Sequence, residues 1–165
     1  MRDGHLKVGQ DAIQGFTTVS LNDRRIAEAL PLIRTTWPGV GLDAWHTFVQ
    51  SFKGKSLPAP SGVIALIDGS GGLCGVLAYR RELDLGDGPI FFVRLFSAID
   101  LRNSSIPVRA LLNAAIARVQ RHGCRSIHIC LTPEQAQLEH RIRSLGVLPL
   151  GSVHRISLDV TPART

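Results

Sequence analysis

Residues 91–129 of the 165-residue chain read FFVRLFSAIDLRNSSIPVRALLNAAIARVQRHGCRSIHI, and this stretch decides the fold. It begins inside an apolar run rich in β-forming residues, 90–98, which predicts a buried strand. Apolar residues recur at i, i+3, i+4 and i+7 within 108–122, and Gly123 follows where a helix would end. A second β-forming run, 126–131, comes directly after. A strand, a helix and a strand in this order predict a crossover with two parallel strands in one sheet.

The flanking sequence completes an α/β (α+β) domain. Asn22 and Asp23 can cap a helix whose apolar residues recur at helical spacing, and Pro38 stops that helix. Two Gly-rich turns separate the apolar runs upstream of the quoted stretch and predict an antiparallel meander. The further expected elements are strands at 63–67, 73–79, 16–21 and 153–160 and helices at 42–52 and 133–145. This order predicts one mixed, mostly antiparallel sheet with helices on both faces.

Length and composition fit one globular domain, since 44% of the residues are apolar and 19% are charged. We expect the domain to span residues 16–160, between tails at 1–15 and 161–165. No apolar run reaches the roughly 20 residues that a membrane helix needs, and the first residues lack the apolar region of a signal peptide. We therefore expect a cytoplasmic protein without a membrane partner.

The formal charge of +6 favours an anionic partner, such as a phosphate-bearing cofactor. Nucleic acid is disfavoured, because the arginines are dispersed along the sequence and only 5% of residues are aromatic. The cysteines, Cys74, Cys124 and Cys130, stand singly among apolar neighbours, so we expect reduced packing residues. The six histidines show no metal-ligand spacing, and no metal site is expected.

Four stretches of the sequence carry a family resemblance: LFSAIDLR at 95–102, RALLNAA at 109–115, HGCRSI at 122–127 and SLGV at 144–147. They resemble the GNAT superfamily of N-acetyltransferases, and the similarity covers nearly everything from Thr17 to Asp159. They look like the fourth strand, the helix after the pyrophosphate loop, the fifth strand and the Leu-Gly turn of that family. The resemblance implies a GNAT-like fold, acetyl-CoA as co-substrate, and a small amine or a protein amine as acceptor. It also allows a homodimer.

The pyrophosphate loop is where the sequence departs most from the family. Family members usually build it as Arg/Gln-x-x-Gly-x-Gly/Ala, whereas residues 102–109 read RNSSIPVR, without glycine. A helix N-terminus still favours an anion through its N–H groups and its dipole. The cofactor-binding residues that the resemblance implies are Leu95, Ser97, Arg102, Asn103, Ser104, Ser105, Val108 and Arg109. In the alternative interpretation, one of the polar loop residues only caps the helix, with Pro107 in its first turn.

The catalytic groups also differ from the family pattern. The family's proton-donating tyrosine corresponds to Ile142, which cannot donate a proton, and an asparagine earlier on that helix is replaced by Gln135. The weak candidates for acid or base chemistry are His140, Ser144 and Glu82, although an exposed helix histidine such as His140 is more often only solvated. The expected substrate-lining residues are Trp45, His46 and Arg94, and the alternative for the aromatic side chains of that helix is core packing.

Two functions are compatible with this sequence. The first is an acyl-CoA-dependent N-acyltransferase that moves an acetyl group to an amine. The alternative is a non-catalytic GNAT-fold module for ligand sensing or protein interaction, because the glycine loop and the proton donor are both missing.

Overall fold

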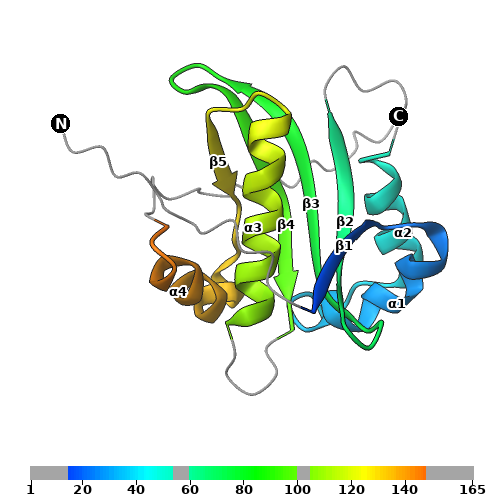
Figure 1. Ribbon diagram of the computed structural model, residues 1–165. Coiled ribbons are helices and arrows are strands. Elements are labelled where there is room, and N and C mark those ends of the chain that lie inside the picture. Colours follow the sequence, from blue (N-terminus) through cyan, green and yellow to red (C-terminus); the bar gives the residue numbers. More distant parts are fainter. Residues whose placement is uncertain (1–14, 54–59, 100–104, 148–165) are drawn as a thin grey trace, which may run out of the picture.

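The computed structural model describes residues 15–53, 60–99 and 105–147 (Figure 1). The elements are β1 (Phe16–Ser20), α1 (Asp23–Arg34), α2 (Leu42–Gln50), β2 (Ser61–Asp68), β3 (Leu73–Asp84), β4 (Gly88–Ala98), α3 (Ile106–Arg121), β5 (Ser126–Ile129), the 3-10 turn η1 (Pro133–Gln135) and α4 (Ala136–Ser144). The strands form one sheet in the order β1-β2-β3-β4-β5, antiparallel except for the parallel pair of β4 and β5. This confirms the predicted mixed, mostly antiparallel sheet and its crossover.

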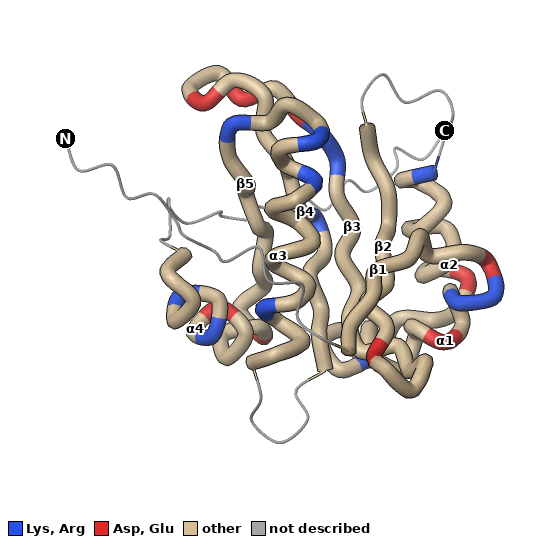
Figure 2. The backbone as a smooth tube through the Cα atoms, viewed as in Figure 1, with Lys and Arg blue, Asp and Glu red and all other residues tan. Residues whose placement is uncertain are grey.

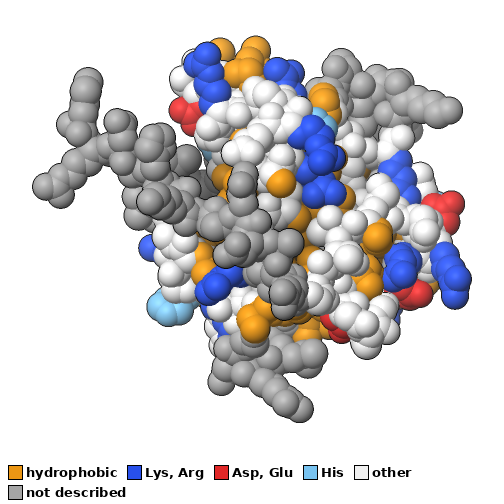
Figure 3. All heavy atoms as spheres, in the orientation of Figure 1, with side chains coloured by type: hydrophobic (Ala, Val, Ile, Leu, Met, Phe, Trp, Pro, Cys, Tyr) orange, Lys and Arg blue, Asp and Glu red, His pale blue; other side chains and the backbone are white. Residues whose placement is uncertain are grey.

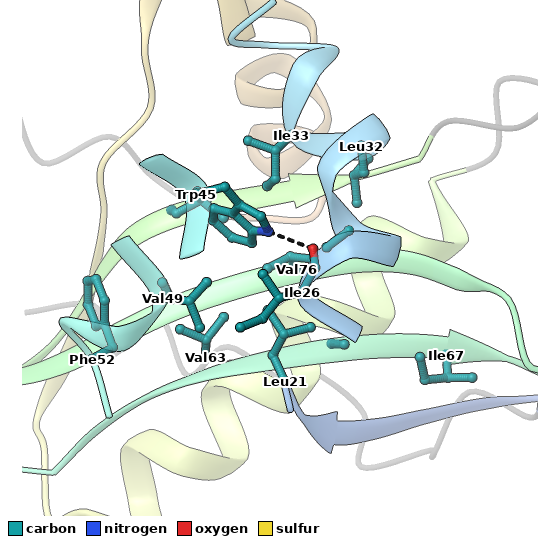
Figure 4. Packing of buried hydrophobic residues seen from close by; sticks show 14 residues of the cluster. Leu21, Ile26, Leu32, Ile33, Trp45, Val49, Phe52, Val63, Ile67 and Val76 are labelled. Carbon is teal, nitrogen blue, oxygen red and sulfur yellow. Dashed lines mark hydrogen bonds between the residues drawn. The ribbon is translucent and has the colours of Figure 1, made fainter. Parts of the chain in front are cut away.

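Helices cover both faces of the sheet, as predicted, because alternate strand residues point to opposite sides. Val63, Ala65 and Val76 pack under α1 and α2, whereas Ile64 and Leu77 pack under α3. In the first core, Trp45 is 2% exposed and its Nε1–H donates to the Ile26 carbonyl oxygen at 2.8 Å, which also joins α2 to α1 (Figure 4).

The cysteines of the structure are free thiols, as the sequence predicted. Cys74 lies in the core beneath α3, and burial raises the pKa of its thiol to about 11. Cys124 and Cys130 are half-buried.

The helix boundaries follow local side-chain chemistry. Asn22 accepts a hydrogen bond from the Arg25 N–H at 3.0 Å, which confirms the predicted cap of α1. Gly123 and Gly146 end α3 and α4 with φ of 63° and 90°, the left-handed conformation that glycine adopts most easily. The helix expected at 133–145 is instead the short turn η1 followed by α4.

Strand β3 is longer than the expected 73–79. Its extension to Asp84 carries charged residues that give no apolar signal, yet it pairs in register with the start of β4. The expected last strand, 153–160, and the expected tails except Gly15 lie outside the described residues. Within the described ranges, no helix is long and apolar enough to cross a membrane.

Candidate functional site

The two strands of the crossover stop pairing at a defined point. The pairs run from Ile90 with Ser126 to Val93 with Ile129, and the Cys130 N–H then donates to the Val93 carbonyl at 2.9 Å. Strand β4 continues to Ala98 after β5 has ended. We call this place the β4–β5 split. It lies at the end of the sheet where α3 begins (Figure 1).

A β-bulge in β4 marks the same position. Leu95 pairs with Ala78 and Val93 pairs with Tyr79, so Arg94 is an extra residue without a partner in β3. A bulge bends its strand, and here the bend falls directly after the last pair with β5. The exposed Arg94 side chain therefore lies at the start of the split.

The main-chain groups of β4 that face the split are those of Phe96 and Ala98. The Phe96 carbonyl accepts a hydrogen bond from the segment after β5, whereas the Ile99 N–H donates to Cys74 of β3 at 2.8 Å. Alternate residues of a strand direct their peptide groups to the same side, so those of Leu95 and Ser97 face β3, as does Ile99. The main-chain groups of Leu95 and Ser97, which were expected to contact the cofactor, therefore face β3 and not the split.

Gln135 spans the split with its side chain. It is 5% exposed, its Nε2 donates to the Phe96 carbonyl at 2.8 Å, and its Oε1 accepts the Thr132 N–H at 3.1 Å. Both ends of the amide are therefore satisfied, as a buried polar group requires. A side chain from η1 thus holds β4 where the β5 main chain no longer does.

The two candidate acid or base residues of α4, His140 and Ser144, lie on the side of the helix that faces away from the core. Ile142, at the position of the family's tyrosine, is 4% exposed and packs with the residues under α3. His140 and Ser144 are exposed, two residues to either side of Ile142, which places them on the opposite side of the helix. The Ser144 hydroxyl donates to the Arg141 carbonyl of its own helix at 2.7 Å. The exposed position of His140 agrees with its alternative interpretation as a solvated residue.

The charges at the start of α3 are more favourable for a bound anion than those at the starts of the other helices. Helices α1, α2 and α4 each have an acidic residue in the first turn, whereas α3 has none and carries the exposed Arg109 there. Ser105 is at the N-cap position without a side-chain capping bond, and its carbonyl accepts the Arg109 N–H at 2.9 Å. Val108 is buried, so only its main chain is available to a ligand. Arg102, Asn103 and Ser104 lie outside the described residues.

The sheet face opposite α3 carries an Asp–His pair that sequence reasoning missed. His128 Nε2 lies 3.0 Å from Asp87 Oδ2, and Ser126 Oγ lies 3.5 Å from the same nitrogen. His128 pairs across the sheet with Phe92, one residue before the last β4–β5 pair. No local signal joins Asp87 to His128, because 41 residues separate them and only the sheet register brings them together.

The turn between β3 and β4 holds Asp87 in place. Asp84 Oδ1 accepts hydrogen bonds from the N–H groups of Gly86 and Asp87 at 2.8 and 2.9 Å. These two bonds lower the pKa of Asp84, and the bond from Asp87 has the larger effect. Glu82 is exposed and pairs with Ile90, two pairs further from the split than the Phe92–His128 pair. Glu82 and His128 share the face that α1 and α2 cover elsewhere.

The expected acceptor residues of α2 do not meet at the split. Trp45 belongs to the core, which agrees with the alternative left open for it, and the exposed His46 lies beside Gln50. A cavity of about 430 Å³ lies elsewhere, between the end of β1, the start of β2 and the end of α2, with Asn22, Lys53 and Ser61 in its lining. In the described part of the chain, no group of three or more His, Cys, Asp or Glu side chains is placed to hold a metal ion.

The sequence matches no protein-family model and no curated protein. The structure, however, resembles solved acetyltransferases. An aminoglycoside N-acetyltransferase, AAC(6')-Iy, in complex with CoA is 15% identical, with a TM-score of 0.68 over 87% of this chain and 95% of that chain. A GNAT family acetyltransferase from Staphylococcus aureus is 11% identical, with a TM-score of 0.66 over 88% and 100%. A transcriptional regulator from Bacillus halodurans is 12% identical, with a TM-score of 0.67 over 87% and 99%.

Proposed function

Because this chain has the fold of the GNAT acetyltransferases, we propose that it is an N-acyltransferase that transfers an acetyl group from acetyl-CoA to an amine. The main structural support for this proposal is the β4–β5 split. It combines a bulged strand, main-chain groups of Phe96 and Ala98 directed away from β3, and a helix start without acidic residues. A structural neighbour solved with CoA supports the choice of co-substrate.

In this proposal different parts of the split bind different parts of acetyl-CoA. The pyrophosphate lies at the start of α3, where Arg109, Ser105 and the loop residues Arg102, Asn103 and Ser104 supply positive charge and hydrogen-bond donors. The pantetheine arm lies along β4. A β4 N–H facing the split polarises the acyl carbonyl, as an oxyanion hole does.

The proton acceptor in the proposal is His128, oriented by Asp87. The amine nitrogen forms a bond to the acyl carbon while the carbon–sulfur bond breaks, and the amine proton passes to His128. CoA leaves as the thiolate, which takes its proton from water, because Ile142 stands where a tyrosine would donate one. Which amine is accepted depends on the face of the sheet that carries Phe92, Arg94 and His128.

The test is acetyl transfer to a panel of amines, followed as free thiol released from acetyl-CoA. We expect the His128→Gln variant to lose about 10²-fold or more in kcat while CoA affinity stays unchanged. His140→Gln, on the exposed side of α4, is the matched control and should retain activity. Equal activity of the two variants would exclude His128 as the base.

A second candidate function is a module that binds acyl-CoA without transferring the acyl group. Ile142 in place of a proton donor favours it, and a neighbour of this fold is a transcriptional regulator. Saturable binding of acetyl-CoA without thiol release for any amine would select this module.

A further inference from the structure

Two arginines of α3 and one arginine of β3, far from them in the sequence, lie around one histidine at the end of α3. Arg118 and Arg121 come from the last turns of α3, His122 caps the helix, and Arg81 comes from the neighbouring strand β3. We call Arg81, Arg118, Arg121 and His122 the arginine cluster. Lys and Arg positions concentrate over this end of α3 and the adjacent part of β3 (Figures 2 and 3).

Among the described residues, no carboxylate neutralises the arginine cluster through an ion pair. The pKa of His122 is lowered mainly by burial and then by the positive charges of Arg121, Arg118 and Arg81. No carboxylate is among the groups that shift this pKa. Within the described residues, none of the three guanidinium groups forms an ion pair, whereas Arg25 and Arg143 each pair with a glutamate of their own helix. Arginines at this density repel one another, so an anion placed among them would be bound favourably.

The cluster also contains a buried hydrogen-bond donor and an aromatic surface. Arg81 Nε is buried and makes no hydrogen bond to any residue that the structure describes. Such a donor is costly in a folded protein unless a ligand or water accepts its hydrogen bond. The His122 ring is stacked with those of Tyr79 and Phe91, at centroid distances of 5.8 and 6.2 Å.

We propose that the arginine cluster binds phosphate groups, supplied by a free polyphosphate or by a nucleic-acid strand. Guanidinium groups match phosphate oxygens in geometry as well as charge, and arginine beside aromatic rings is typical of surfaces that bind nucleotides. The sequence disfavoured this ligand, because Arg81 lies far from Arg118 and Arg121 along the chain. The fold brings Arg81 to the same surface as the two arginines of α3.

This site is separate from the β4–β5 split. The split lies beside the start of α3, and the helical rise places Arg118, Arg121 and His122 about 18–24 Å further along the helix axis. The proposal therefore holds whether or not the chain transfers acetyl groups.

The test measures binding of two probes, inorganic tripolyphosphate and a fluorescently labelled twelve-nucleotide oligo-dT, to the full chain. The site variant is Arg81→Gln, Arg118→Gln, Arg121→Gln. The matched control, Arg24→Gln, Arg25→Gln, Arg143→Gln, removes the same formal charge elsewhere. Arg118→Gln with Arg121→Gln serves as a second site variant that leaves the sheet unchanged.

We expect the site variants to weaken binding roughly tenfold or more and the control to change it less than about threefold. The NMR signal of His122 should shift with the probe, while that of the exposed His140 stays in place. Binding of both probes identifies phosphate itself as the ligand, and binding of oligo-dT alone identifies a strand. Equal losses in the site and control variants, an unmoved His122 signal, or no saturable binding of either probe would overturn the proposal.

Discussion

Gln135 is the side chain on which the geometry of the split most depends. Its amide replaces the β5 main chain as the partner of the Phe96 carbonyl. We predict that Gln135→Ala lowers the free energy of unfolding by about 1–3 kcal/mol, because a buried carbonyl loses its donor. Gln137→Ala, at an exposed position of α4, is the control in the same urea titration. A loss no larger than that of the control would show that the bond contributes nothing.

His122 gives the fold a pH dependence whose sign follows from its surroundings. Burial and the arginines of α3 and β3 lower its pKa in the folded state, so the unfolded chain binds a proton more readily. Stability should therefore fall as pH drops below about 6.5, the pKa of an unperturbed histidine. We predict that His122→Asn reduces the difference in unfolding free energy between pH 7.5 and pH 5.5. His140→Gln should leave that difference unchanged, and a similar change in both variants would contradict this assignment.

At the scale of elements, α3 approaches the sheet closely at Gly75. A Cβ added there would lie 3.2 Å from Leu66 Cβ and 3.3 Å from Leu111 Cδ2. We predict that Gly75→Ala destabilises the fold by about 1–3 kcal/mol through overpacking. In the control, Gly39→Ala, the added Cβ has no described residue within 4 Å apart from its chain neighbours, so the change should cost less in the same thermal or urea measurement. Wild-type stability of Gly75→Ala would show that α3 can move away from β3.

The elements differ in how far the sequence predicts them. The sequence predicts strands β4 and β5 from their β-forming runs, and helix α3 from its helical period and from Gly123 at its end. The sequence does not predict the bulge at Arg94, because an inserted residue changes the register of β4 against β3 without changing the amino-acid composition of β4. The pairing of Asp87 with His128 was likewise unpredictable, because it depends on which strands become neighbours.

At the scale of the whole molecule, α3 connects two regions with different proposed ligands. Its start faces the split, where we place acetyl-CoA, and its end carries the arginine cluster. If Arg102 and Arg109 hold the pyrophosphate, changing both to alanine should weaken CoA binding by about 2–4 kcal/mol without loss of stability. Arg143→Ala on α4 is the control. Unchanged CoA affinity in a folded double variant would exclude the two arginines as phosphate ligands.

The central claim is that the β4–β5 split binds an acyl-CoA. Calorimetric titration of the full chain with acetyl-CoA, up to millimolar concentration, tests it most directly. Our account predicts saturable binding of one acetyl-CoA per chain. Complete absence of binding at millimolar acetyl-CoA would contradict the account.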